Sequence, residues 1–259
     1  MHPMLNIAVR AARAAGKILV KNFDQGSPVE AESKGLNDWV TDMDKAAEQA
    51  IINTIKKSYP DHGIIAEESG TQAGKENDFQ WVIDPLDGTT NYMRGIPHFC
   101  ISIALLHKGS VQQAVVYDPM REELFTATRG AGAQLNGRRL RISPKVELKG
   151  AILATGFPFK MKNRLPEYLE MFSKLFEHCA DVRRAGAAAL DLAYVAAARH
   201  DAFWEMGLKP WDMLAGELLV REAGGIVSDF QGGHNYIQSG NIAAGAPKDI
   251  IGWIDEPSV

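Results

Sequence analysis

The pattern that most constrains the fold lies in residues 99–143, where apolar segments of strand length alternate with turn residues. It predicts strands over residues 99–106, 111–117, 123–128 and 134–142. The pairs that separate them, Lys-Gly, Asp-Pro and Arg-Gly, are turn signals. Strands joined by such short turns pair antiparallel. This part of the chain is therefore expected to form a β-meander.

The segments on either side of the meander show helical spacing of their apolar residues. They predict a first helix that ends near Phe23, a polar loop up to Asn37, and a second helix that Thr41 caps and that ends before Tyr59. After residue 143 we expect alternating elements: strands over residues 151–155, 202–205, 226–230 and 242–244, and helices over residues 165–178, 188–198, 210–223 and 247–254. This order is typical of an α+β or α/β fold. We expect a part with helices and an antiparallel sheet over residues 1–143, and an alternating α/β part over residues 144–259.

Composition excludes several classes of protein. With 28 Lys and Arg residues against 32 Asp and Glu residues, the formal net charge is −4. Sequence-independent binding to nucleic acid, which needs many basic residues, is therefore not favoured. The two cysteines stand far apart and suggest neither a disulfide framework nor a cysteine zinc site, which fits a reducing, cytoplasmic compartment. The apolar runs are shorter than the roughly 18 residues of a membrane span, so no membrane contact is expected.

The most informative segment for function runs from Asp84 to Asn91 and has the sequence DPLDGTTN. A predicted strand over residues 80–83 delivers Asp84 to its end, and the turn at Pro85 brings Asp87 round three residues later. Two carboxylates and the backbone carbonyl between them can then converge. Such oxygen ligands are those that Mg²⁺ prefers.

The residues after Asp87 favour an anion site next to this metal site. Gly88 lets the backbone approach a ligand closely. Thr89 and Thr90 offer N–H groups and hydroxyls where a helix begins. A metal beside an anion site is the arrangement that phosphoryl chemistry needs. An Asx-type turn before a capped helix is the structural alternative, but the length and context of the segment favour the functional interpretation.

Further acidic residues stand at the ends of predicted elements. Glu67 and Glu68 follow a short predicted strand, and Asp212 stands in the first turn of a predicted helix. The structural alternative for the two glutamates is a solvated turn. For Asp212, it is a side chain that only complements the dipole of its helix. Asp44, three residues after Thr41, also resembles part of a helix cap. Together, the acids at positions 67, 84, 87 and 212 predict a multi-metal site built from strand ends and a helix start.

Other phosphatase chemistries fail on spacing. An aspartyl nucleophile of the dehalogenase type needs two Asp residues two positions apart, whereas Asp84 and Asp87 are three apart. A cysteine phosphatase loop needs Arg at the sixth position after its Cys, where Cys179 has Ala185 instead. The sequence also contains neither a P-loop nor a His-Glu-x-x-His motif. A covalent phospho-enzyme is therefore not expected.

These segments together resemble the inositol monophosphatase family, and the resemblance is closest to its bacterial members. It is carried by DPLDGTTN, by AEES at residues 66–69, and by Trp211-Asp212 followed by EAGG at residues 222–225. It implies a five-layered αβαβα sandwich of the lithium-sensitive, metal-dependent sugar phosphatase type, and a homodimer. It further implies a Mg²⁺-dependent phosphomonoesterase that hydrolyses inositol monophosphate by means of a metal-activated water.

The resemblance also implies a role for each site residue. Glu67, Asp84 and the Leu86 carbonyl would hold a first metal, and Asp84, Asp87 and Asp212 a second. Glu67 would also contact a third, weaker metal.

The remaining implied roles concern the water and the substrate. Thr89 and Asp44 would orient the attacking water, and Glu67 completes the catalytic set. Glu205 would hydrogen-bond the inositol ring, with Ala188 on the same wall. The full set of implied substrate contacts is Asp87, Gly88, Thr89, Ala188 and Glu205.

One departure from the family leaves the exact substrate open. The family usually has Ser or Thr after Gly186, and this chain has Ala187. The alternatives are related phosphatases that act on a nucleotide 3′-phosphate, NADP, histidinol phosphate or fructose bisphosphate. A protein- or RNA-binding role in transcription, with the phosphatase site secondary, is a further alternative. Its basic positions would be Arg183-Arg184 and the RRLR segment at residues 138–141.

Overall fold

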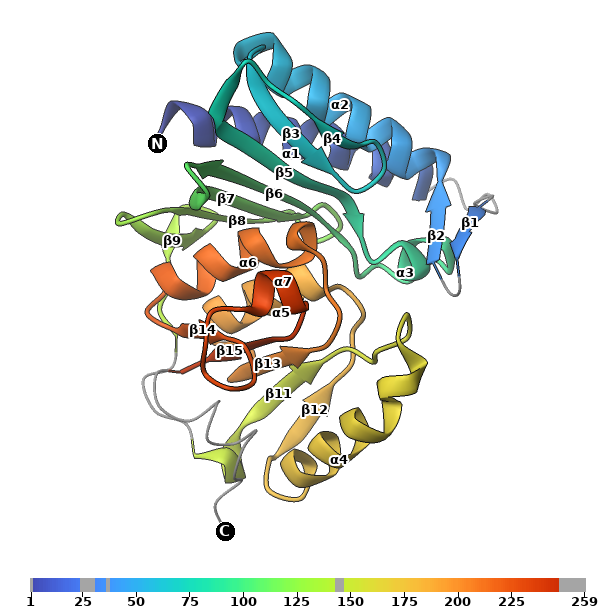
Figure 1. The fold of residues 1–259 in the computed structure, drawn as a ribbon, viewed down its shortest axis with the longest axis vertical. Helices are drawn as coiled ribbons and strands as arrows, with labels where there is room; N and C mark the ends of the chain where they lie inside the picture. Colours follow the sequence, from blue (N-terminus) through green and yellow to red (C-terminus); the bar gives the residue numbers. More distant parts are fainter. Residues whose placement is uncertain (1, 24–30, 36–37, 143–146, 247–259) are drawn as a thin grey trace.

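The structure, a computed structural model, describes residues 2–23, 31–35, 38–142 and 147–246. Helices and sheets alternate in five layers, αβαβα, from top to bottom in Figure 1. Both sheets are mixed, and helices cover them on the outside and separate them in the middle. The layered α+β architecture that the sequence predicts is therefore confirmed.

The first layer consists of α1 (Pro3–Phe23) and α2 (Asp42–Ser58), which cover the outer face of the larger sheet (Figure 1). The sequence predicts the limits of both helices well. Thr41 caps α2, and the helix ends one residue before Tyr59. Helix α1 buries a face of small and branched residues, so the two helices can lie close to each other and to the sheet.

The larger sheet has eight strands in the order β10-β9-β8-β7-β6-β5-β3-β4. Strands β3 and β5 run parallel, and every other neighbouring pair is antiparallel. Their bounds are β3 (His62–Ala66), β4 (Gly70–Gln72), β5 (Glu76–Asp87), β6 (Cys100–His107), β7 (Ser110–Asp118), β8 (Glu123–Thr128), β9 (Gly132–Leu135) and β10 (Arg138–Arg139). The predicted meander is confirmed, but the single strand predicted over residues 134–142 is wrong. Asn136 and Gly137 have φ values of 49° and 79°, which turn the chain into a hairpin between β9 and β10.

The smaller sheet has five strands in the order β12-β11-β13-β15-β14. Helices α5 and α6 lie between the two sheets, and α4 covers the outer face of the smaller one (Figure 1). The bounds are β11 (Ile152–Thr155), β12 (Asp181–Arg183), β13 (Ala202–Glu205), β14 (Ile226–Ser228), β15 (Ile242–Gly245), α4 (Leu165–Phe176), α5 (Ala188–Ala196), α6 (Pro210–Glu222) and α7 (Tyr236–Ser239). Two 3₁₀ helices, η1 (Leu148–Gly150) and η2 (Lys162–Arg164), precede β11 and α4.

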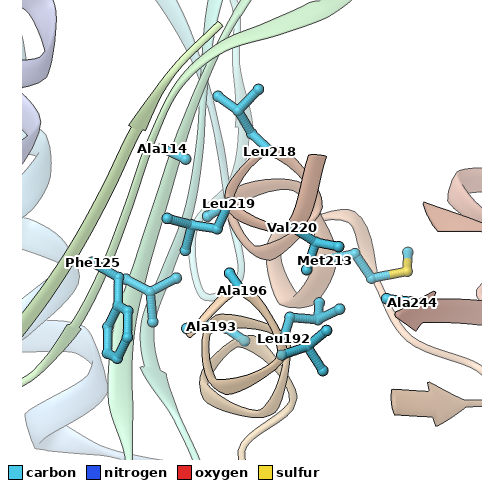
Figure 2. Close-up of a cluster of buried hydrophobic side chains, with 14 of the residues drawn as sticks. Ala114, Phe125, Leu192, Ala193, Ala196, Met213, Leu218, Leu219, Val220 and Ala244 are labelled. Atoms are coloured by element: carbon cyan, nitrogen blue, oxygen red, sulfur yellow. The ribbon is translucent and has the colours of Figure 1, made fainter. Parts of the chain in front are cut away.

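Helices α5 and α6 of the middle layer belong to an extended cluster of buried apolar residues. Figure 2 shows Leu219 of α6 beside Phe125 of the larger sheet, while Leu192 of α5 and Met213 of α6 lie toward the smaller sheet. A Cβ atom at Gly216 would come within 2.4 Å of the Leu192 Cβ, so glycine lets α5 and α6 approach closely. Each fully buried leucine contributes roughly 1.5–3 kcal/mol to stability. This packing fixes the starts of α5 and α6, which carry site residues.

Elements that the sequence did not predict have weak local patterns. Strand β12 has only three residues and forms on the open edge of β11. The polar loop expected before Asn37 is partly wrong, because β1 (Ala31–Gly35) pairs with β2 (Asp38–Thr41) as a small hairpin. The helix predicted over residues 247–254 lies outside the described residues. Among the helices that the structure describes, none has the combination of length and hydrophobicity that crossing a bilayer requires.

Candidate active site

The acidic segment at residues 84–91 forms where the pairing of β5 with β6 is interrupted. Asp84 pairs with Ser102, but Asp87 pairs with Cys100, so β5 has one residue more than its partner over this stretch. Pro85, which lacks an N–H group, falls within the interruption. This bulge takes the end of β5 out of the regular ladder and leaves both aspartates on the wall of one cavity.

Backbone N–H groups hold the two aspartates in place. The Leu86 N–H donates to Asp84 Oδ1 at 2.9 Å. The Ala189 N–H, in the first turn of α5, donates to Asp87 Oδ2 at 2.7 Å. The second contact ties the end of the larger sheet to the middle layer, across 102 residues of sequence.

Gly88 connects the bulge to the short helix α3 (Thr89–Met93). Its φ of 98° lies in the left-handed region that glycine adopts readily. A Cβ atom at this position would lie 3.0 Å from the His98 carbonyl oxygen and 3.2 Å from the Phe99 Cα. Both the backbone conformation and the lack of space therefore favour glycine where the chain borders the cavity.

Asp44 belongs to a helix cap and also reaches the site through Thr89. One carboxylate oxygen accepts from the Thr41 N–H at 2.8 Å and from the Thr41 hydroxyl, which completes a capping box on α2. The other oxygen lies 3.1 Å from the Thr89 hydroxyl oxygen. Burial raises the pKa of Asp44, and the hydrogen bonds from Thr41 and Thr89 partly counteract this rise. The Asp44 side chain can therefore cap α2 with one oxygen and contact Thr89 with the other.

Glu67 and Asp212 approach the site from two different layers. Glu67 follows β3 of the larger sheet, while Asp212 stands in the first turn of α6. The Lys209 N–H donates to the Asp212 carboxylate at 2.7 Å, so Asp212 is part of a helix cap as well as of the cavity wall. The Ser102 hydroxyl donates to the Trp211 carbonyl at 2.9 Å and fixes the start of α6 against the larger sheet.

One cavity of about 510 Å³ collects the residues that the sequence singles out. Asp44 is the exception, because it lies behind Thr89 and does not line the cavity. The structure thus brings together side chains from both sheets and from the middle layer. The sequence-predicted residues on the cavity wall are Glu67, Asp84, Leu86, Asp87, Gly88, Thr89, Ala188, Glu205 and Asp212.

The carboxylates in this cavity repel one another. Burial raises the pKa of Asp84 well above its ordinary value, and repulsion from Glu67, Asp87 and Asp212 adds to the rise. Burial is also the main cause of the raised pKa values of Asp87 and Asp212. These groups are therefore costly to keep ionised without a nearby cation.

The donor chemistry of the cavity fits Mg²⁺, although the acids do not converge on one point. Within the described ranges, no three acidic, histidine or cysteine side chains are arranged to hold an ion as they stand. Four carboxylates on one wall are all hard oxygen donors, and a divalent cation would remove their repulsion.

Comparison with known proteins identifies the family. The sequence model described as "Inositol monophosphatase family" matches residues 1–256. The chain belongs to the inositol monophosphatase family. A curated relative, "Nus factor SuhB" of Escherichia coli (strain K12), is 65% identical over 250 residues, which cover 96% of this chain and 94% of the relative. This confirms the resemblance to the bacterial, SuhB-type members of the family.

Solved structures of this family share the fold. The crystal structure of extragenic suppressor protein suhB from Bartonella henselae has a TM-score of 0.92 and 42% identity, and the match covers 95% of this chain and 94% of that one. The inositol monophosphatase from Anabaena (Nostoc) sp. has a TM-score of 0.86 and 40% identity, over 97% of this chain and 94% of that one. The five-layered architecture is thus that of inositol monophosphatase structures.

In this family member, Glu205 is enclosed in a tight part of the cavity wall. It is the last residue of β13 and is 6% exposed. Burial raises its pKa well above the ordinary value, and the positive charge of Arg184 acts in the opposite direction. A Cβ atom at Gly156 would come within 2.1 Å of the Glu205 carboxylate, so the glycine after β11 leaves the space that this carboxylate occupies.

A group of cationic and aromatic residues on the same wall is not predicted from the sequence. They come from the segments after β11 and β12, from the residue after α3 and from the residue before α6. Gly156-Phe157-Pro158, a turn signal directly after a predicted strand, could have indicated the first of these segments. Arg184, which the sequence suggests as a basic surface position, is exposed and also lines the cavity. The residues in question are Arg94, Phe157, Phe159, Lys160, Arg184 and Lys209.

Proposed function

We propose that this protein is a Mg²⁺-dependent phosphomonoesterase that hydrolyses inositol monophosphate to inositol and phosphate. The observation that carries the proposal is the single cavity in which carboxylates from separate layers lie beside Gly88 and Thr89. The relationship to inositol monophosphatases supports the reaction class. A homodimer and a cytoplasmic location are part of the same proposal.

The proposed roles of the acidic residues follow from their positions. Glu67, Asp84, the Leu86 carbonyl, Asp87 and Asp212 would hold Mg²⁺, whose charge stabilises the attacking and leaving oxygens of an in-line displacement. Backbone N–H groups hold one carboxylate oxygen each of Asp84, Asp87 and Asp212, which limits how these side chains can turn.

Thr89 and Asp44 provide a route for the proton of the attacking water. The Thr89 hydroxyl lies 3.1 Å from Asp44 Oδ1 and 3.0 Å from the Leu86 carbonyl oxygen. With its proton directed at Asp44, its oxygen can accept a hydrogen bond from water in the cavity. The water proton would pass to Thr89 Oγ1 as the hydroxyl proton passes to Asp44 Oδ1. The raised pKa of Asp44 makes it a better proton acceptor than an exposed aspartate.

Glu205 and Ala188 would form the wall that selects the alcohol part of the substrate. A carboxylate can accept hydrogen bonds from neighbouring ring hydroxyls, and Ala188 adds a small apolar contact beside it. A phosphorylated cyclitol or sugar supplies both the phosphate for the metal side and hydroxyls for Glu205.

Phosphate release tests this proposal. Inositol 1-phosphate would be assayed with and without Mg²⁺, beside a nucleotide 3′-phosphate, NADP, histidinol phosphate and fructose bisphosphate. We expect the highest kcat/KM for inositol 1-phosphate, and activity only with Mg²⁺. A higher value for a competitor would assign the site to that substrate. A lack of phosphate release from every substrate in Mg²⁺ would refute the proposal.

A second function is favoured by the names of the relatives. Proteins named "Nus factor SuhB" are 65% identical to this chain, which supports a contact with the transcription machinery or RNA. We propose that such a contact does not use the phosphatase chemistry. Tagged wild-type protein and Asp87→Asn should then retain the same transcription proteins or RNA in a pull-down. Absence of such components from both pull-downs would contradict this role.

A further inference from the structure

Hydrogen bonds donated by three successive backbone amides hold the loop that carries Glu67. The Glu67 N–H donates to the Ile83 carbonyl of β5 at 3.1 Å. The next two N–H groups, of Glu68 and Ser69, donate to the two carboxylate oxygens of Glu48, each at 2.9 Å. The sheet therefore fixes the first amide of this loop, and one side chain of α2 fixes the other two.

Glu48 is suited to this contact because of its position and its chemistry. It is 3% exposed and lies one helical turn after Asp44 on α2. An ionised carboxylate presents two acceptor oxygens and no donor, whereas Gln offers one acceptor and an NH₂ group. Here the two N–H groups donate to two different oxygens, an arrangement that a carboxylate offers and Gln does not. Hydrogen bonds to a charged acceptor are also the stronger kind.

Helix α2 thus contacts both parts of the candidate metal site. Asp44 holds Thr89, which follows the Asp87 turn, and Glu48 holds the loop after Glu67. We propose that Glu48 is a positioning residue that directs Glu67 toward the metal. In this proposal α2 sets the separation of the Glu67 loop and the Asp87–Thr89 turn. The inference rests on the proposed function in one respect, that Glu67 is a metal ligand.

The first test is Glu48→Gln, which changes one atom of the side chain and leaves its volume almost unchanged. Losing a residue that orients a ligand typically weakens metal affinity about 10- to 100-fold. Mg²⁺ binding to the free protein, measured by calorimetry, should weaken by that factor, and the Mg²⁺ concentration for half-maximal phosphate release should rise in parallel. Glu170→Gln is the matched control, because it makes the same change on an exposed helix position paired with Lys174. It should leave both values unchanged.

A double-mutant cycle with Glu67→Gln separates positioning from a general structural effect. If Glu48 acts through Glu67, Glu48→Gln should have little further effect on Mg²⁺ affinity once Glu67 is replaced. If the losses of Mg²⁺ affinity in the two single variants multiply in the double variant, the proposal is overturned. Unchanged Mg²⁺ affinity in Glu48→Gln would also overturn it.

Hydrogen exchange in the wild-type protein tests the contact itself, whether or not the variants fold. The Glu68 and Ser69 amides should be protected from exchange without Mg²⁺, although Ser69 is exposed. Exchange of both amides at the rate of an unstructured loop would overturn the proposal. A different result would refute the proposed function: wild-type protein that neither binds Mg²⁺ nor releases phosphate.

Discussion

Replacement of Glu205 tests whether the cavity recognises the alcohol part of its substrate. The Glu205 carboxylate is buried at the end of β13 and lines the cavity outside the proposed set of metal ligands. Loss of the hydrogen bond between a ring hydroxyl and its buried acceptor costs about 1–3 kcal/mol of binding free energy. With RT of about 0.59 kcal/mol, this corresponds to a loss in kcat/KM of about 5- to 160-fold. Glu205→Gln keeps one acceptor oxygen and should fall near the lower limit, whereas Glu205→Ala should fall near the upper limit.

The assay compares kcat/KM for two substrates in each variant. Inositol 1-phosphate should show the full loss, and an aryl phosphate, which offers no hydroxyls, should be hydrolysed almost as fast as by the wild type. Gly156 leaves the space for the carboxylate, so truncation to Ala opens that space without forcing a clash. Equal losses for both substrates would refute the reasoning. Glu205 would then act on stability or on the metals.

Asp87→Asn should lose at least about 100-fold in turnover at saturating Mg²⁺, because charge stabilisation by a metal is worth several kcal/mol. Full activity in EDTA would contradict metal dependence. Millimolar Li⁺ should inhibit phosphate release where K⁺ does not, because Li⁺ is small enough for an oxygen site but stabilises developing charge poorly. Unchanged rates at high Li⁺ would count against the assignment of the second metal to the three aspartates. The contribution of His62 to the free energy of unfolding should fall as the pH drops below about 6.5, the ordinary pKa of histidine. Burial lowers the pKa of His62, whose Nδ1 accepts from the Trp81 indole N–H at 3.1 Å, so the unfolded chain binds a proton more readily than the native state. Urea unfolding at two pH values should show a smaller pH dependence in His62→Gln, and equal dependence in both proteins would rule out this histidine.

Agreement between sequence and structure is best where local chemistry sets the limits of an element. Thr41 and Asp44 form a capping box that starts α2, and Pro210 starts α6 at the predicted residue. The strand predicted over residues 123–128 is β8 without any change. Caps, prolines and turn residues act on the few residues beside them, so a local pattern contains the information that decides these limits.

Disagreement occurs where a partner from elsewhere in the chain decides the structure. Strand β12 (Asp181–Arg183) is too short to show a pattern, and it forms because β11 offers an open edge. Strand β1 (Ala31–Gly35) has no apolar alternation, and it forms by pairing with β2. In both cases the strand depends on backbone hydrogen bonds that a neighbouring strand supplies.

For the candidate site, the sequence by itself singles out the residues that we propose to carry the chemistry. The acids at 67, 84, 87 and 212, the glycine at 88 and the threonine at 89 were all recognisable from residue type, spacing and resemblance to a family. The tertiary structure alone decided that most of them share one cavity, that Arg184 lies on its wall, and that Glu48 holds the loop after Glu67. The physical reason is that these distances depend on α2 packed outside the larger sheet and on α5 and α6 packed between the two sheets. That packing results from many weak, non-directional contacts spread over the whole chain, which no short segment of sequence encodes.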